Sequence, residues 1–247
     1  MEYVVRILFS VLATAPFVLL ASWATNRKTP WWALLFFGLM FFDLVLTGLP
    51  TLLPVDFPGA MNWTGKALSL AWPVVFLFYS STFDRENVGL TFQQREGSFL
   101  PAVLFTVFLI VLGLILSSTL ADGGSTDAET IAFQATMPGL AEELVFRGLF
   151  LAILDRIYDP NTSFLGAPVG WGVLITSVAF GFGHGIGLDG WTPTFSAIPF
   201  VATFVSSLFL TWLKERTGSL AFPVIAHNGG NLAIMLAAQH GGLQHAV

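Results

Sequence analysis

The sequence has no cysteine and few charged residues. Only 10% of its 247 residues are Asp, Glu, Lys or Arg, whereas soluble globular proteins carry about 25%. The absence of cysteine excludes disulfide bonds, thiolate metal sites and cysteine nucleophiles. The ten basic residues form no cluster and the formal net charge is −5, so a nucleic acid is not an expected partner.

Hydrophobic residues, by contrast, make up 55% of the chain. A membrane span needs about 20 mostly apolar residues, and eight stretches meet or nearly meet this length: residues 4–24, 31–53, 67–83, 98–120, 130–158, 169–184, 195–213 and 219–240. They predict an all-α fold, a polytopic transmembrane helix bundle of about eight spans in a single membrane domain, residues 1–247. The first stretch could instead be a cleaved signal peptide, but its basic start is the single Arg6 and no small-residue cleavage site ends it.

Eight alternating spans would divide the basic residues unequally between the two sides of the membrane. One side holds Arg27, Lys28, Arg85, Arg95, Arg156, Lys214 and Arg216. The other side holds only Arg6 and Lys66. Because cytoplasmic loops are enriched in Lys and Arg, we expect the first side to be cytoplasmic and both termini to lie outside. We expect a multi-pass protein of a prokaryotic plasma membrane. Asp43, inside the second stretch, has no partner that the sequence reveals.

The stretch AEELVFRGLF, residues 141–150, places Glu142, Glu143 and Arg147 in an otherwise apolar run. A charged side chain at the centre of a bilayer costs roughly 2.5–3.5 kcal/mol on insertion scales. Pro138 and Gly139 come just before it. Since proline suits the first turn of a helix and breaks its interior, we expect a break there. The two glutamates then lie in the first turns of a new helix, where the helix dipole favours carboxylates.

Glu143 and Arg147 are spaced i, i+4, which places them on one helix face as an ion pair. Glu142 is rotated by about 100° from Glu143, so we expect Glu142 to face a cavity while the pair braces the helix. An ion pair that only fixes helix registry is the alternative. That alternative leaves Glu142, which has no evident partner, unexplained.

Two later stretches carry the other polar groups of the spans. FGFGH, residues 180–184, ends in His184, and its glycines and Gly185 allow another backbone or a substrate to come close. HNGGN, residues 227–231, places His227 and Asn231 at i, i+4. A lone histidine at a helix end is often a hydrogen-bonded interfacial residue, and an Asn beside a His can join two helices. Together with Glu142, however, the three stretches provide a base, a partner for it and two oxyanion donors.

The sequences EELVFRG, FxxxH and TGSLAFPVIAHNGGN, in this order over about residues 131–237, resemble the three motifs of the CPBP family of CAAX prenyl endopeptidases and bacteriocin-processing (ABI-type) enzymes. The resemblance implies a bundle of about eight helices around a polar cavity, with endopeptidase activity. It implies Glu142 as the base, Glu143 and Arg147 as its support, and His184, His227 and Asn231 as the remaining catalytic residues. The expected partners are membrane lipid and a peptide or protein substrate, lipidated at a CAAX-type tail or carrying a leader.

The expected mechanism needs no cofactor. Glu142, assisted by His184, deprotonates a water that attacks a peptide carbonyl, and His227 and Asn231 stabilise the oxyanion. The rival mechanism uses zinc, with Glu142, His184 and His227 as ligands and a fourth position open for water. The helical HExxH signature of zinc peptidases is absent. The unequal distribution of Lys and Arg between the two sides of the membrane places this site toward the outside. A CAAX-type enzyme, by contrast, is expected to work on cytosolic tails.

Two other functions use the same residues. A proton-coupled transporter could relay protons through Glu142, His184 and Asp43, but the chain has no paired halves with matching broken helices. A catalytically silent immunity or scaffold protein could share the fold. The complete set of motif residues counts against that reading.

Overall fold

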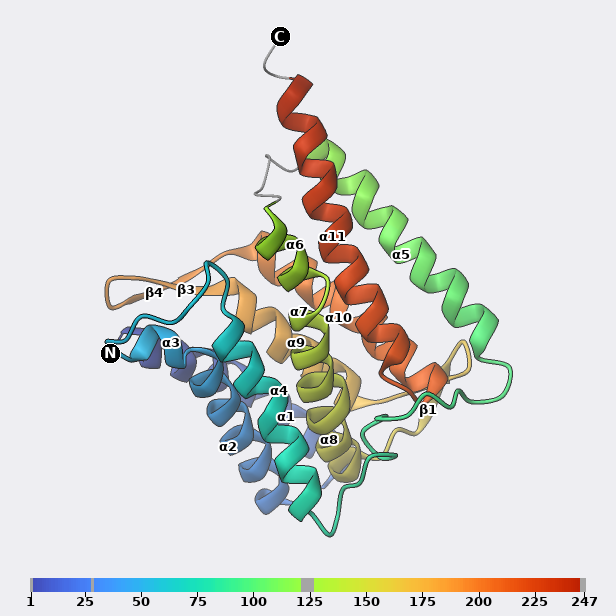
Figure 1. Ribbon diagram of the computed structural model, residues 1–247. Helices are drawn as coiled ribbons and strands as arrows, with labels where there is room; N and C mark the ends of the chain where they lie inside the picture. The colour runs from blue at the N-terminus through green and yellow to red at the C-terminus, as the bar shows by residue number, and fades with distance from the viewer. Residues whose placement is uncertain (1, 28, 121–126, 245–247) are drawn as a thin grey trace.

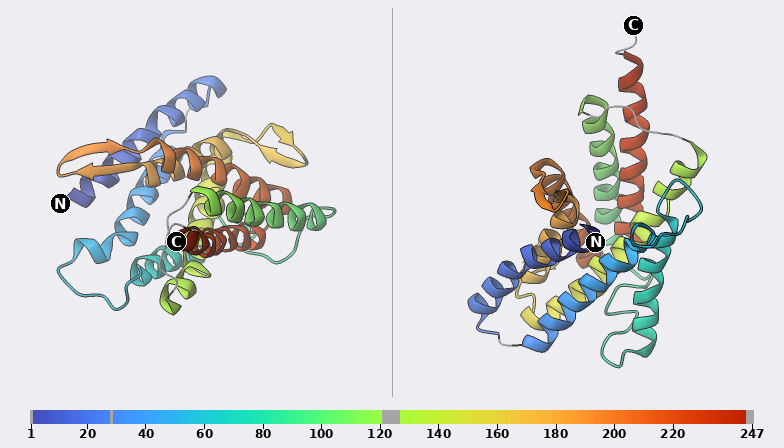
Figure 2. Two further views of the ribbon diagram at one scale, coloured as in Figure 1. Left: turned by 90° about the horizontal axis from the view of Figure 1, so that it is seen from above. Right: turned by 90° about the vertical axis from the view of Figure 1, so that its left-hand side faces the viewer.

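The computed structural model describes residues 2–27, 29–120 and 127–244, and it is 73% helical. The helices are α1 (Glu2–Thr25), α2 (Pro30–Thr47), α3 (Leu49–Leu52), α4 (Trp63–Tyr79), α5 (Phe99–Leu120), α6 (Ala128–Gln134), α7 (Met137–Glu142), the π-helix η1 (Glu143–Phe150), α8 (Leu151–Tyr158), α9 (Trp171–Gly185), α10 (Ala197–Thr217) and α11 (Ala221–Gln244). Two antiparallel hairpins join them: β1 (Thr162–Phe164) with β2 (Ala167–Val169), and β3 (Ile186–Asp189) with β4 (Thr192–Phe195). These hairpins were not predicted, and they project on opposite sides of the bundle (Figure 2).

Each predicted apolar stretch corresponds to a helix or a series of helices, but eight membrane spans are not confirmed. In the described residues, four helices are long and apolar enough to cross a membrane: α1, α2, α5 and α10. Helices α4 and α9 have 17 and 15 residues, which is short for a hydrocarbon core about 30 Å thick. The fifth stretch is divided into α6, α7, η1 and α8.

The π-helix η1 lies at the centre of the molecule, and all of its residues are buried. Packed around it is the main hydrophobic core, which includes Phe36 of α2, Phe150 of η1 and Ile175 of α9. Helices α5 and α11 lie side by side and extend away from the other helices (Figure 1). The charged residues Glu143 and Arg147 are therefore inside the protein and do not face lipid.

The predicted break at Pro138 is confirmed. Pro138 lies in the first turn of α7, after the chain leaves α6. The side chain of Asn228 bridges the break: its Oδ1 accepts a hydrogen bond from Gly139 N (2.7 Å) and its Nδ2 donates one to Thr136 O (3.1 Å). A buried backbone group without a partner is costly, so Asn228 stabilises a bend that an unbroken helix would not contain.

The glycines that precede and follow Phe182 allow the close approach that the sequence predicts. A Cβ atom at Gly181 would lie 3.0 Å from the ring of Phe200 in α10, and one at Gly185 would lie 2.7 Å from Phe200 Cβ. A Cβ at Gly183 would meet no atom within 4 Å. Two of the three glycines therefore bring α9 against α10, and Gly183 faces open space.

While Lys28 lies outside the described residues, three other basic residues of the first side gather at one end of the helices. There Arg27 pairs with Asp159 (2.7 Å), Arg216 donates to Gly97 O (2.8 Å), and Arg95 lies against the end of α10. Arg6 and Lys66, which the sequence analysis assigned to the opposite loops, lie within α1 and α4 instead. Helix α4 begins before Lys66 because Asn62 caps it, accepting a hydrogen bond from Gly65 N.

Candidate active site

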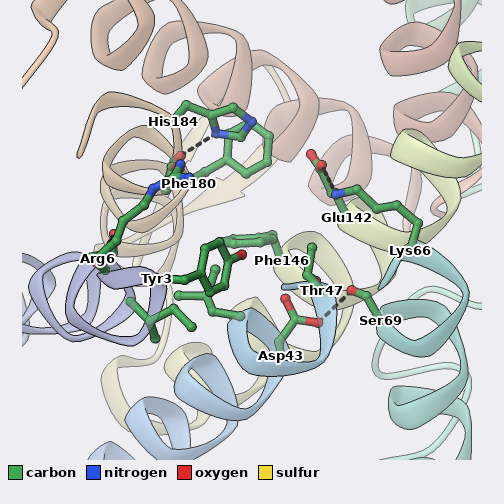
Figure 3. A pocket seen from close by; sticks show the side chains of 14 residues that line it. Tyr3, Arg6, Asp43, Thr47, Lys66, Ser69, Glu142, Phe146, Phe180 and His184 are labelled. Carbon is green, nitrogen blue, oxygen red and sulfur yellow. Dashed lines mark hydrogen bonds and ion pairs between the residues drawn. The ribbon is translucent and has the colours of Figure 1, made fainter. Parts of the chain in front are cut away.

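A cavity of about 260 Å³ lies between α1, α2, α4, η1 and α9 (Figure 3). The polar side chains that line it come from five helices: Tyr3, Arg6, Ser10, Asp43, Thr47, Lys66, Ser69, Glu142 and His184. Apart from Glu142, the last residue of α7, they come from the N-terminal parts of α1 and α4 and the C-terminal parts of α2 and α9. The cavity therefore lies at the end of these helices that is opposite the basic loops.

Glu142, the last residue of α7, faces the cavity as predicted. Its Oε1 forms an ion pair with the ammonium of Lys66 from α4. Glu142 thus has the partner that the sequence did not reveal. Its Oε2 has no hydrogen-bond partner within the described part of the chain and lies 3.8 Å from His227 Nε2. Oε2 is buried and His227 is not among the residues that line the cavity, so a water molecule reaches this pair only if the side chains move apart.

Glu143 and Arg147 form the predicted ion pair, with Glu143 Oε1 3.0 Å from Arg147 Nη1 and both side chains fully buried. The guanidinium also lies over the ring of Phe180, 4.3 Å from its centroid, a cation–π contact that stabilises a desolvated cation. The pair forms although the segment is a π-helix and not the α-helix that we predicted. Isolated π-turns within helices are frequent at functional sites.

His227 lies between the two glutamates. Its Nδ1 is 2.6 Å from Glu143 Oε1. Since an ionised carboxylate can only accept a hydrogen bond, Nδ1 carries a hydrogen and donates the hydrogen bond to Glu143. This contact turns Nε2 toward Glu142 and fixes which nitrogen is free to act there. Glu143 therefore orients His227 as well as pairing with Arg147, a second role that the i, i+4 pattern does not indicate.

His184 lines the cavity on the wall away from Lys66 (Figure 3), where its Nδ1 donates to Phe180 O at 2.9 Å. Asn231 lies elsewhere: it donates from Nδ2 to Gln134 Oε1 of α6 (3.0 Å) and is not among the residues that line the cavity. The structure thus brings Glu142, Glu143, Arg147 and His227 into one connected cluster. His184 lies at the cavity nearby, and Asn231 one turn of α11 beyond His227.

Sequence reasoning missed several contacts of this region, including the partners of Asp43. Asp43 is buried, and its Oδ1 accepts hydrogen bonds from Ser69 (2.6 Å) and Trp72 (2.8 Å) of α4. Lys66 could have been suspected, because the N-cap residue Asn62 precedes it by four positions and extends α4 to include it. Asn228 lies within HNGGN itself, but only the fold shows that it bridges the break before α7.

Glu142, His184 and His227 do not form a zinc site in this arrangement. Within the described ranges, no three His, Asp or Glu side chains are grouped closely enough to hold a metal ion. The ammonium of Lys66 on Glu142 also disfavours a second cation at that carboxylate.

Comparison with known proteins places these motifs in a family. No curated protein and no solved structure gave a match. A family model described as Type II CAAX prenyl endopeptidase Rce1-like matches residues 124–233, which contain all three motifs. With four apolar helices of spanning length, the match indicates an integral membrane protein related to proteases. The motif-bearing part of the chain, residues 124–233, therefore matches the type II CAAX prenyl endopeptidase Rce1-like family, within the CPBP group.

Proposed function

We propose that the protein is an intramembrane endopeptidase that hydrolyses a peptide bond of a membrane-associated, lipidated substrate. The observation that best supports this function is the cluster around Glu142. One oxygen of its carboxylate is paired with Lys66, the other lies 3.8 Å from His227 Nε2, and Glu142 itself lines a polar cavity. The Rce1-like family supports a CAAX-type intramembrane protease.

In the proposed reaction Glu142 Oε2 accepts a proton from a water molecule held between it and His227 Nε2. The water oxygen attacks the peptide carbonyl carbon, and the oxyanion forms on the carbonyl oxygen. The proton on Glu142 then passes to the leaving nitrogen as the C–N bond breaks, which leaves a carboxylic acid and an amine. General-base help of this kind contributes about 10²–10⁴-fold.

The remaining residues assist this step. His227 lies between two carboxylates; when both of its ring nitrogens carry a proton, Nε2 donates to the oxyanion while Glu143 and Arg147 keep the ring in place. A preorganised donor of this kind contributes roughly 2.7–4 kcal/mol where it has been measured. His184, on the cavity wall, is proposed to assist Glu142 in deprotonating the water molecule. Asn231 is proposed as the second donor, which requires it to exchange Gln134 for the substrate.

The substrate class is tested with purified protein in lipid vesicles and synthetic peptides that end in a CAAX sequence. Each peptide is supplied with a farnesyl group on its cysteine and, as the matched control, with an unmodified serine there. We expect cleavage of the farnesylated peptide, no cleavage by Glu142→Ala or His227→Ala, and a single product cut detected by mass spectrometry. Cleavage that both substitutions leave unchanged would contradict the function proposed for these residues.

Metal dependence is tested on the same preparation. Because the described donors do not gather into a zinc site, we expect active protein to contain less than stoichiometric zinc by elemental analysis. Activity should also persist after dialysis against a chelator. Stoichiometric zinc, with activity lost on chelation and regained when zinc is added back, would contradict the glutamate mechanism.

A further inference from the structure

Arg6 is a cationic cavity residue whose charge the proposed mechanism does not use. It lies in the first turns of α1, partly buried, and lines the cavity. Its Nε donates to Ile186 O (2.9 Å) and its Nη2 to Gly183 O (3.0 Å), at the junction of α9 and β3 just after His184. Among the residues described, no carboxylate forms an ion pair with it.

The other cations inside the bundle differ from Arg6 in this respect. Lys66 is paired with Glu142, and Arg147 with Glu143 and the ring of Phe180. A cation removed from water without a counter-ion is costly. The carbonyls of Gly183 and Ile186 satisfy two of its N–H groups but do not neutralise its charge. An arginine held in this way has a fixed orientation, with further N–H groups left to bind an anion.

We propose that Arg6 binds the terminal carboxylate of the peptide that is cut, an inference that rests on the proposed endopeptidase function. Arg6 and Glu142 lie on opposite sides of the cavity (Figure 3). The cavity, at about 260 Å³, is slightly smaller than typical ligand sites of about 300–1,000 Å³. A cavity of this size limits what can bind between the base and the arginine to a short segment. The enzyme then selects bonds close to a free C-terminus, because only there does the carboxylate reach Arg6.

The test compares two peptides that differ in one group. Both have the best-cleaved sequence; one ends in a free carboxylate and the other in a carboxamide. For the wild-type protein in vesicles we expect kcat/KM to be about 10- to 100-fold higher for the free acid, the range for a hydrogen bond to a charged group. For Arg6→Gln the ratio should fall to near one, through loss of activity on the acid alone. For Arg6→Lys, which keeps the charge but not the planar fork, the ratio should be intermediate.

The ratio of kcat/KM for the free acid to kcat/KM for the carboxamide separates substrate binding by Arg6 from a structural effect of the substitution. Arg27 lies beyond the other end of α1, where it pairs with Asp159 at the surface, so Arg27→Gln is the matched control and should keep the wild-type ratio. If Arg6→Gln lowers cleavage of both peptides equally, Arg6 only joins α1 to the α9–β3 junction and the inference is wrong. Equal cleavage of both peptides by the wild type also overturns it, while Glu142-dependent cleavage still supports the protease function. Failure to cleave either peptide contradicts the protease function itself.

Discussion

Glu142 and Glu143 are adjacent in the chain but have different surroundings. Glu143 is fully buried and accepts hydrogen bonds from Arg147 and His227. Glu142 is 13% exposed, faces the cavity and pairs with Lys66. This difference gives the two carboxylates separate tasks: Glu143 fixes the position of His227, and Glu142 keeps one oxygen, Oε2, without a hydrogen-bond partner among the described residues. The sequence predicts the division through the i, i+4 spacing, but it does not predict that His227 joins both groups.

Lys66→Met should destabilise the protein by about 1–3 kcal/mol. Removing one partner of a buried ion pair costs about 3–5 kcal/mol because the other charge stays buried, and this pair retains some exposure to the cavity. The variant Lys66→Met/Glu142→Gln should regain part of the loss, since it leaves no uncompensated charge. Unfolding of the purified protein in detergent measures both. A double variant as unstable as the sum of the two single variants would show that the ion pair contributes no coupling energy.

At the scale of the elements, the site depends on the interrupted helix α6–α7–η1–α8. The break after Gln134 and the π-helical segment place Glu142 at a junction that is open to the cavity, while every residue of η1 is buried. Pro138 made the break predictable. The π-helix was not predictable, because it arises from contacts with other helices and has no signal in local hydrophobic spacing. The side-chain directions of η1 therefore come from the structure alone.

Helix α9 offers a matched pair of glycines for testing its contact with α10. Gly185→Ala would place a Cβ 2.7 Å from Phe200 Cβ, so we expect about 1–3 kcal/mol of destabilisation from overpacking. Gly183→Ala meets no atom within 4 Å and should be neutral or slightly stabilising, because alanine favours a helix. Thermal unfolding of the two variants gives the comparison. Equal stability would mean that α10 can move away from α9 at little cost.

At the scale of the whole molecule, the charges are asymmetric. The described basic residues of the loops lie at one end of the helices, whereas the cavity lies at the other end of α1, α2, α4 and α9. The only two basic residues that the tally had assigned to the second side, Arg6 and Lys66, line the cavity. Arg156, Lys214 and Arg216 of the first side likewise lie within helices, so the structure removes basic residues from both sides of the tally and the orientation stays a prediction.

A reporter joined after Val247 tests this orientation. Helix α11 begins directly after the basic end of α10 and runs away from it for 24 residues. The positive-inside rule therefore predicts a C-terminus outside the cytoplasm. In a bacterial host, fused alkaline phosphatase should be active and fused green fluorescent protein dark. A fluorescent fusion with inactive phosphatase would reverse the orientation, and the cavity would then open toward the cytoplasm.

Much of this architecture was predictable from composition and spacing. Apolar runs gave the positions of the helices, and three short motifs gave Glu142, Glu143, Arg147 and His227, which do converge. The contributions of α1, α2 and α4 were not predictable, because Arg6, Asp43 and Lys66 reach the cavity through tertiary packing. The hairpin β3–β4 was also missed, since its four-residue strands interrupt an apolar region. The number of helices that cross the membrane stays a prediction.

The central claim is that Glu142 and His227 act as one unit on a water molecule at this cavity. The most direct test is the turnover of the best-cleaved peptide by Glu142→Gln, His227→Ala and the double variant, each shown to unfold like the wild type. We expect each single substitution to lower kcat at least about 100-fold. The double variant should be no slower than the slower single variant, because residues of one catalytic unit are not additive. Wild-type turnover by either single variant, or losses that multiply in the double variant, would contradict the claim.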